Sequence, residues 1–264
     1  MSYRSTLSRL LDAVIAPSAE RVRAQGRFPR SSLTALGQAG LLGLTVSTDL
    51  GGGGRGLADA ADVVTRVARA CPATATVLQS HYAAAAVVEA YGSRWLRGEI
   101  AAGRHLSSLA LDEAAAEGRR TRLQSGASDA SATRSGGVVA LRARKHDVVA
   151  AGEADSYIWS SRPLAARDGL TLWVVPAHAA DLFVPASPVG AGPYGSGTST
   201  VFADPVLIPA DAMLGPDGEG FDIVQGIVEP WLLELQTAVG AAVTGPVAVG
   251  SSFGSARLAT DSLA

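Results

Sequence analysis

Apolar residues recur every three or four positions from the N-terminus to about residue 103, which is the period of helices that bury one face. Pro29, Pro72 and four glycines at 51–54 separate these segments, as proline and glycine do at helix ends. The recurring positions are Leu7, Leu10, Leu11 and Val14; Leu33 and Leu36; Leu57, Ala60, Val63, Val64 and Val67; and the stretches 73–91 and 95–102. The pattern predicts an all-helical domain over residues 1–104.

Between residues 106 and 209 the pattern changes to short runs rich in β-branched and aromatic side chains. Clusters of glycine, proline and serine separate the runs, as is typical of strands joined by turns. The runs are LSSLALD, GGVVALRA, HDVVAA, DSYIWSS, LTLWVVP and TSTVFA. They predict a β-sheet domain over residues 105–215.

Helical periodicity returns after a loop, PADAMLGPDGEG. From Phe221 onward the apolar positions are Ile223, Val224, Ile227, Val228, Leu232 and Leu235. They predict a helical segment within residues 216–264, interrupted at Gly245-Pro246. The order of helices, sheet and helices predicts an α+β protein.

Composition limits the classes of partner. The chain has 264 residues, of which 47% are hydrophobic, enough to bury a sizeable core. Its 22 basic and 24 acidic residues give a net charge of −2, so nothing indicates a nucleic acid partner.

The single cysteine, Cys71, excludes an intramolecular disulfide and agrees with a reducing compartment. The N-terminal stretch lacks the pattern of a signal peptide. The most apolar window, residues 73–90, carries Gln79, His81 and Glu89, so a buried helix is favoured over a membrane span. We therefore expect a cytoplasmic protein without a membrane partner.

The stretch GLLGLTVSTDLGGGGRG, residues 40–56, could cradle a phosphate or simply turn the chain. Gly51, Gly53 and Gly56 match G-x-G-x-x-G, but that fingerprint also needs an acidic residue about 20 positions later and surrounding βα units. Thr76 occupies the acidic position and predicted helices flank the run. We therefore favour a turn that needs positive φ angles and keep the phosphate cradle as the alternative.

The histidines give no sign of a metal site. His81, His105, His146 and His178 show no metal-ligand spacing with one another or with Cys71. We expect no metal ligand.

Five blocks in a fixed order resemble the flavin-dependent acyl-CoA dehydrogenase family. The first contains GLLGLTVSTDLGGGGRG, where the family has a GLLGL.VP..YGG.G passage between two helices. The others are HYAAAAVVEAYGS, IAAGRHLSSLALDE, GEADSY and YGSGTSTVFADPVLIPADAMLGPDGEGF, and the resemblance covers about residues 27–245. It implies an N-terminal helical domain, an antiparallel barrel-like β domain and a short remnant of the family's C-terminal helical bundle.

The resemblance also implies FAD held against the β domain and an acyl-CoA or acyl-carrier thioester as ligand. In the family a glutamate takes the α-proton while a hydride passes to the flavin. In some members this base lies on the first C-terminal helix, and the matching position here is near Trp231. Glu229 and Glu234 are the nearest carboxylates, and we hypothesise that one is catalytic; the alternative is that both are solvated helix charges.

The resemblance places a flavin contact region at the end of the LSSLALD run and just after it. Leu109 and Leu111 lie at the end of the run, and the family's TEP..GSD passage aligns with residues 112–119. A hydroxyl has become Asp112, and the family's small glycine and serine have become Glu117 and Gly118. Two carboxylates beside a pyrophosphate repel it, so FAD binding is in doubt; alternatively, both are ordinary surface charges.

A second flavin passage, K.W.T, aligns with residues 145–149. Asp147 replaces the aromatic residue, and Val149 replaces the hydroxyl that meets the flavin ring. A valine side chain has no proton to donate to flavin N5. This second passage therefore also puts FAD in doubt.

Three functions remain open. The first is an FAD-dependent dehydrogenase whose missing helices come from a partner chain. The second is a flavin-free thioester-binding or non-redox protein, and the third is a non-catalytic subunit. Because an apolar helix left without its bundle partners drives association, we expect a homodimer or a hetero-oligomer with a full-length homologue.

Overall fold

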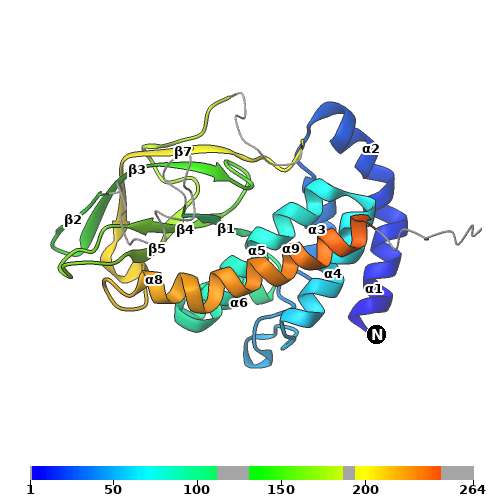
Figure 1. The fold of residues 1–264 in the computed structure, drawn as a ribbon, viewed down its shortest axis with the longest axis horizontal. Helices are drawn as coiled ribbons and strands as arrows, with labels where there is room; N and C mark the ends of the chain where they lie inside the picture. The colour runs from blue at the N-terminus through cyan, green and yellow to red at the C-terminus, as the bar shows by residue number, and fades with distance from the viewer. Residues whose placement is uncertain (1, 112–130, 187–193, 245–264) are drawn as a thin grey trace, which may run out of the picture.

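The computed structural model describes residues 2–111, 131–186 and 194–244. It places the strands at one end of an elongated molecule and the first helices at the other (Figure 1). The predicted α+β class and element order are confirmed.

The N-terminal part is helical, as predicted. Its helices are α1 (Tyr3–Leu10), η1 (Leu11–Ile15), α2 (Ala16–Gln25), α3 (Arg30–Gln38), α4 (Leu57–Ala70), α5 (Pro72–Tyr91) and α6 (Arg94–Ala101). The periodic residues face inward, since Leu7, Leu36, Val63, Val64 and Val67 are all fully buried. Burial of one apolar face on each helix explains why this sequence folds locally into helices.

Helix α5 is the central element of the helical part. It packs against α4, α6, α9 and β1. Buried residues lie on most of its circumference. Many of them are alanines, whose small side chains let several elements approach closely. Two buried polar side chains tie it to the segment before the glycine run: Tyr82 donates to the carbonyl of Leu41 at 2.7 Å, and His81 Nε2 lies 3.0 Å from the carbonyl of Leu42.

The glycine run is a turn that follows η2 (Thr48–Leu50). Gly51 and Gly54 have φ angles of 84° and 58°, which glycine adopts without steric penalty. All four glycine N–H groups are bonded within the turn: Gly51 to Thr48 O, Gly52 to Ser47 O, Gly53 to Gly43 O and Gly54 to Val46 O. These donors are therefore unavailable to a phosphate, and the turn interpretation is confirmed.

Within residues 107–111, 131–186 and 194–214, the β part consists of two four-stranded sheets. Their strand orders are β1-β4-β5-β8 and β2-β3-β7-β6. The strands are β1 (Ser107–Ala110), β2 (Ser131–Ser135), β3 (Val138–Val148), β4 (Ser156–Ser161), β5 (Thr171–Pro176), β6 (Leu182–Phe183), β7 (Ser199–Pro209) and β8 (Met213–Leu214). Neighbours are antiparallel except for β1 and β4, which are parallel.

Some strands differ from the expected runs. Strand β3 joins GGVVALRA to the first residues of HDVVAA, and three strands were not expected. The exposed sequence SATRS of β2 lacks an alternating apolar face, while β6 and β8 have only two residues each. These three segments are strands because they pair with longer neighbouring strands. Their own sequences do not indicate this pairing.

The chain returns to helix after η3 (Ala210–Ala212), through α8 (Gly220–Ile223), the wider turn η4 (Val224–Val228) and α9 (Glu229–Thr244). Helix α9 lies along α4 and α5, which buries Leu235 completely while Leu233 remains 68% exposed. Part of this helix is thus covered within the chain. Among the helices of the described residues, none combines the length and apolarity that a bilayer crossing requires.

Candidate functional site

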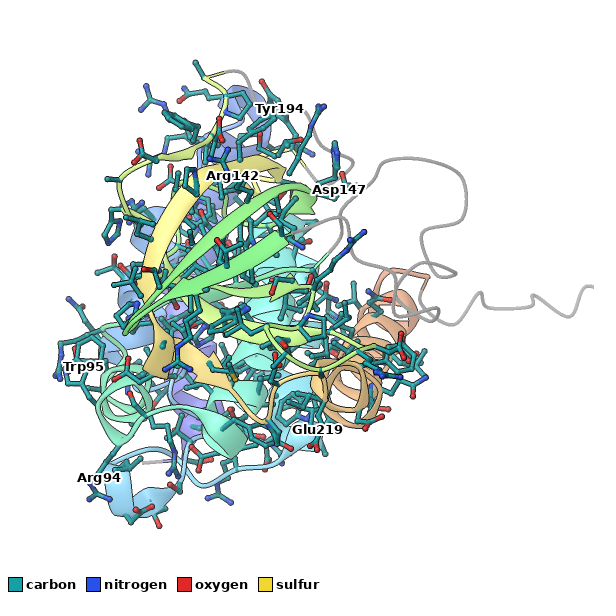
Figure 2. The ribbon with its side chains drawn as sticks, turned by 90° about the vertical axis from the view of Figure 1, so that its left-hand side faces the viewer. Arg94, Trp95, Arg142, Asp147, Tyr194 and Glu219 are labelled. Atoms are coloured by element: carbon teal, nitrogen blue, oxygen red, sulfur yellow. The ribbon has the colours of Figure 1, made fainter. Side chains whose placement is uncertain are left out.

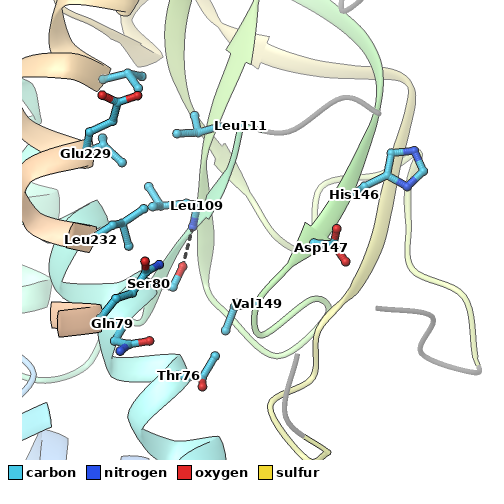
Figure 3. Close-up of a pocket in the computed structure, with 13 residues that line it drawn as sticks. Thr76, Gln79, Ser80, Leu109, Leu111, His146, Asp147, Val149, Glu229 and Leu232 are labelled. Atoms are coloured by element: carbon cyan, nitrogen blue, oxygen red, sulfur yellow. Dashed lines mark hydrogen bonds between the residues drawn. The ribbon is translucent and has the colours of Figure 1, made fainter. Parts of the chain in front are cut away.

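A cavity of about 450 Å³ lies where helices and sheet meet. Its walls come from α5, β1, the end of β3, η4 and α9 (Figure 3). The apolar lining residues are Leu109, Leu111, Val149, Val224, Val228 and Leu232, and the polar ones are Thr76, Gln79, Ser80, His146, Asp147, Glu229 and Gln236. A cleft of this volume that combines apolar walls with polar groups is typical of small-molecule sites.

The end of β1 is held in place by a buried lysine. Lys145 is fully buried, and its Nζ donates to Ser160 Oγ at 2.7 Å. The Ser160 hydroxyl in turn donates to the carbonyl of Leu111 at 3.0 Å. The ammonium also lies 5.4 Å from the centre of the Trp159 ring. Lys145 therefore fixes the position of Leu111 on the cavity wall.

Two serine hydroxyls connect α5 to the two strands that line the cavity. Ser108 Oγ donates to the carbonyl of Val149 at 2.6 Å. Because a hydroxyl has one proton, the 2.8 Å contact between Ser80 Oγ and Ser108 Oγ must be donated by Ser80. Ser80 also accepts from Leu109 N at 3.1 Å. Both hydroxyl protons are used within the protein and are not offered to a ligand.

A β-bulge re-aims the end of β3. The register of β3 against β7 shifts between Lys145 and Val148, and Asp147 has a φ of 52°, which aspartate tolerates better than most residues. Bulges often re-aim side chains beside active sites. Figure 3 shows His146 and Asp147 on the β3 side of the cavity, across from Glu229 on α9.

The structure distinguishes between the two candidate bases. Glu229 begins α9 and lines the cavity. Glu234 is exposed on the same helix and does not line it. A base must reach the proton that it removes, so of these two glutamates Glu229 is the candidate for this cavity.

Four of the seven residues predicted to bind the cofactor lie together in this cavity. Leu109, Leu111, Asp147 and Val149 all line the cavity. Asp112, Glu117 and Gly118 lie outside the described residues.

Sequence reasoning missed Thr76, Gln79, Ser80 and Gln236, which also line the cavity. Gln79 Nε2 donates to the carbonyl of Leu235 at 3.2 Å and joins α5 to α9 across the site. Gln79 and Ser80 are polar residues in the most apolar window of the chain. That contrast was the available signal, because a polar residue in a buried helix needs a partner or a ligand.

The described side chains fit a flavin only in part. The leucines and Val149 offer apolar surface to a planar ring, but the hydroxyls of Ser80 and Ser108 already donate elsewhere. At Val149, where the resemblance places a donor, there is only a hydrocarbon side chain. Ser80, Ser108 and Val149 therefore do not supply the hydrogen-bond donors that a reduced flavin anion needs.

No group of three or more histidine, cysteine or carboxylate side chains could hold a metal ion within the part of the chain that the structure describes. Cys71 is buried, with Thr74 donating to its sulfur at 3.1 Å.

Comparison with known sequences gives a consistent picture. Residues 2–102 match the family model described as acyl-CoA dehydrogenase, N-terminal domain. The chain is 26% identical over 216 residues to an acyl-CoA dehydrogenase of Bacillus subtilis strain 168. This alignment covers 79% of the chain and 56% of the relative, so the chain spans about half the length of the curated relatives that it matches.

Solved structures show the same fold. Butyryl-CoA dehydrogenase from Megasphaera elsdenii superposes with a TM-score of 0.78 at 19% identity, covering 91% of this chain and 63% of that one. KijD3, solved in complex with FMN and dTDP-3-amino-2,3,6-trideoxy-4-keto-3-methyl-D-glucose, superposes with a TM-score of 0.72 at 25% identity and covers 91% of this chain and 61% of its own.

Proposed function

Because the chain belongs to the acyl-CoA dehydrogenase family, we propose that its cavity binds an acyl thioester, from acyl-CoA or an acyl carrier. The observation that carries this proposal is the position of Glu229 in a cavity of about 450 Å³ whose walls include six aliphatic side chains. Apolar walls suit an acyl chain. A carboxylate at the cavity can remove the proton on the carbon next to the thioester carbonyl.

FAD-dependent dehydrogenation would require donors other than Ser80, Ser108 and Val149. We propose that a partner chain, either a second copy or a full-length homologue, completes the site when this reaction takes place. Light scattering at micromolar concentration tests this association. A monomer that remains monomeric with a longer homologue contradicts it.

Replacing Glu229 by glutamine is expected to slow exchange of the α-proton of butyryl-CoA with D2O by about 100-fold, because general bases contribute roughly 10²–10⁴-fold. Proton NMR measures the exchange, and calorimetry measures the affinity for butyryl-CoA, which should stay within about threefold. Glu234→Gln is the matched control, since Glu234 lies on the same helix outside the cavity. Equal effects of the two substitutions, or none, would contradict the role of Glu229.

The alternative is a flavin-free thioester-binding protein or a non-catalytic subunit. It is favoured by the hydrocarbon side chain of Val149 at the position where the resemblance places a hydrogen-bond donor to the flavin. Val149→Thr is expected to raise the retention of added FAD by up to about tenfold, because it adds a hydroxyl to a wall that is otherwise unchanged, and a hydrogen bond to the neutral ring of oxidised flavin contributes about 0.5–1.5 kcal/mol. Flavin absorbance after desalting measures the retained FAD. If wild type and variant retain the same high amount, the side chain at Val149 does not limit flavin binding.

A further inference from the structure

A second cavity, of about 520 Å³, lies beyond the start of β1. Arg104 and His105, which precede β1, line this cavity, whereas Leu109 and Leu111 at the other end of the strand line the first one. Helix α6, the ends of α5 and β5, and the segment around β8 form its walls. The two cavities share no lining residue.

Two aromatic side chains border this second cavity and face water. Trp95 in the first turn of α6 is 69% exposed, and Tyr91 at the end of α5 is 43% exposed. Figure 2 shows Trp95 on the outer surface of the molecule. Neither ring is buried in the core, so both offer a π-face beside the cavity. Leu96 and Leu214 add apolar surface to its lining.

The arginines around the second cavity are already paired. Arg104 forms a two-pronged ion pair with Glu99, with Nη2–Oε1 at 2.6 Å and Nε–Oε2 at 3.0 Å. Arg97 of α6 binds Glu89 in the same manner, at 2.7 and 2.9 Å. A guanidinium held by a carboxylate contributes little net positive charge to its surroundings.

The carboxylates that line the cavity make fewer hydrogen bonds than these arginines. Asp155 accepts one hydrogen bond, from Leu106 N to Oδ2 at 2.7 Å. Asp211 is exposed on η3. Burial lowers the pKa of His105 despite the nearby Asp155 and Glu99 carboxylates, so that its ring is neutral at neutral pH. The cavity therefore combines two aromatic faces with an excess of negative charge.

We propose that this second cavity binds a small organic cation of the alkylammonium class, held over Trp95 and beside Asp211 and Asp155. Aromatic faces attract cations through the ring quadrupole, and aromatic residues with carboxylates recognise quaternary ammonium groups. The volume of the cavity lies within the range of small-molecule sites. This site is separate from the thioester cavity and does not depend on the function proposed above.

Calorimetry with choline tests the proposal at a pH of ~8, where histidine side chains are ordinarily neutral. The uncharged analogue 3,3-dimethylbutan-1-ol is the comparison, because it has the same shape without the charge. Choline is expected to bind at least about tenfold more tightly. Equal binding of the two compounds, tighter binding of the anion AMP, or no binding of choline at millimolar concentration would each overturn the proposal.

Two substitutions locate the binding. Trp95→Leu and Asp211→Asn are each expected to weaken choline binding at least about fivefold, since they remove a π-face and a charge. Both side chains are exposed, so the fold should be unaffected, which circular dichroism checks. Asp222→Asn and Glu229→Gln change exposed carboxylates outside this cavity and should leave choline binding unchanged. Wild-type affinity in both cavity variants would overturn the assignment.

Discussion

Replacing Gly52 by alanine is expected to lower the free energy of unfolding by about 3 kcal/mol, at the upper end of what overpacking costs. A Cβ at this position would lie 2.2 Å from the carbonyl oxygen and 2.6 Å from the carbonyl carbon of Val46. Both atoms belong to the backbone, so no side-chain rotation relieves the clash. Relief requires movement of the turn that contains the hydrogen bonds of Gly53 and Gly54. Urea denaturation followed by circular dichroism measures the change.

Gly98 provides a matched control with the opposite sign. It lies inside α6, where an added Cβ meets nothing within 4 Å. Gly98→Ala should therefore stabilise the protein by up to about 1 kcal/mol through helix propensity. A Gly52 variant as stable as wild type would mean that the close approach to Val46 does not constrain this turn.

The glycine run shows why some of the fold was predictable. The motif G-x-G-x-x-G is present, but the flanking sequence has helical rather than βα periodicity, and that flanking pattern alone argues against a nucleotide loop. Helices such as α4 are equally predictable, because their periodicity reports burial directly. The backbone atoms that the glycines approach are not predictable, because Val46 and Gly43 become neighbours of the run only when the turn closes.

The candidate site was predictable to a similar extent. Leu109, Leu111 and Val149 could be assigned from motif register, and they line one cavity with Glu229. Register gave no way to choose between Glu229 and Glu234, since that depends on which face of α9 contacts α4 and α5. The hydrogen bonds that link Ser80, Ser108 and Val149 were also not predictable, because these residues lie far apart in the sequence and only the tertiary fold brings them together.

Lowering the pH from about 7.5 to 5 is expected to reduce the free energy of unfolding by about 2 kcal/mol through His81 alone. Burial depresses the pKa of His81 to about 4 from an ordinary value of 6.5. The unfolded chain therefore binds a proton below pH 6.5 that the folded chain refuses until about pH 4. The stabilising contribution is complete above the unfolded pKa and is lost as the pH falls through this window. His105, whose pKa burial also lowers, acts in the same direction.

The hydrogen bonds of His81 explain why the neutral ring is retained. Its Nδ1 accepts from Ser107 N at 3.2 Å, which requires an unprotonated Nδ1, so Nε2 carries the proton and donates to the Leu42 carbonyl. Protonating Nδ1 would place two donors face to face in a site with no exposed surface. Protonation of His81 at low pH therefore weakens the contacts between α5, β1 and the turn before the glycine run.

Urea denaturation at the two pH values, for wild type, His81→Gln and His178→Gln, measures this contribution. The His81 variant should lose about 2 kcal/mol of the pH dependence, and His178→Gln controls for the removal of a histidine at an exposed position. If His81→Gln does not fold, the NMR titration of the wild-type ring replaces it, and the resonance should keep its neutral position down to about pH 4. A ring that titrates near pH 6.5, or an unchanged pH dependence in the variant, would show that burial of His81 does not set the acid stability of this fold.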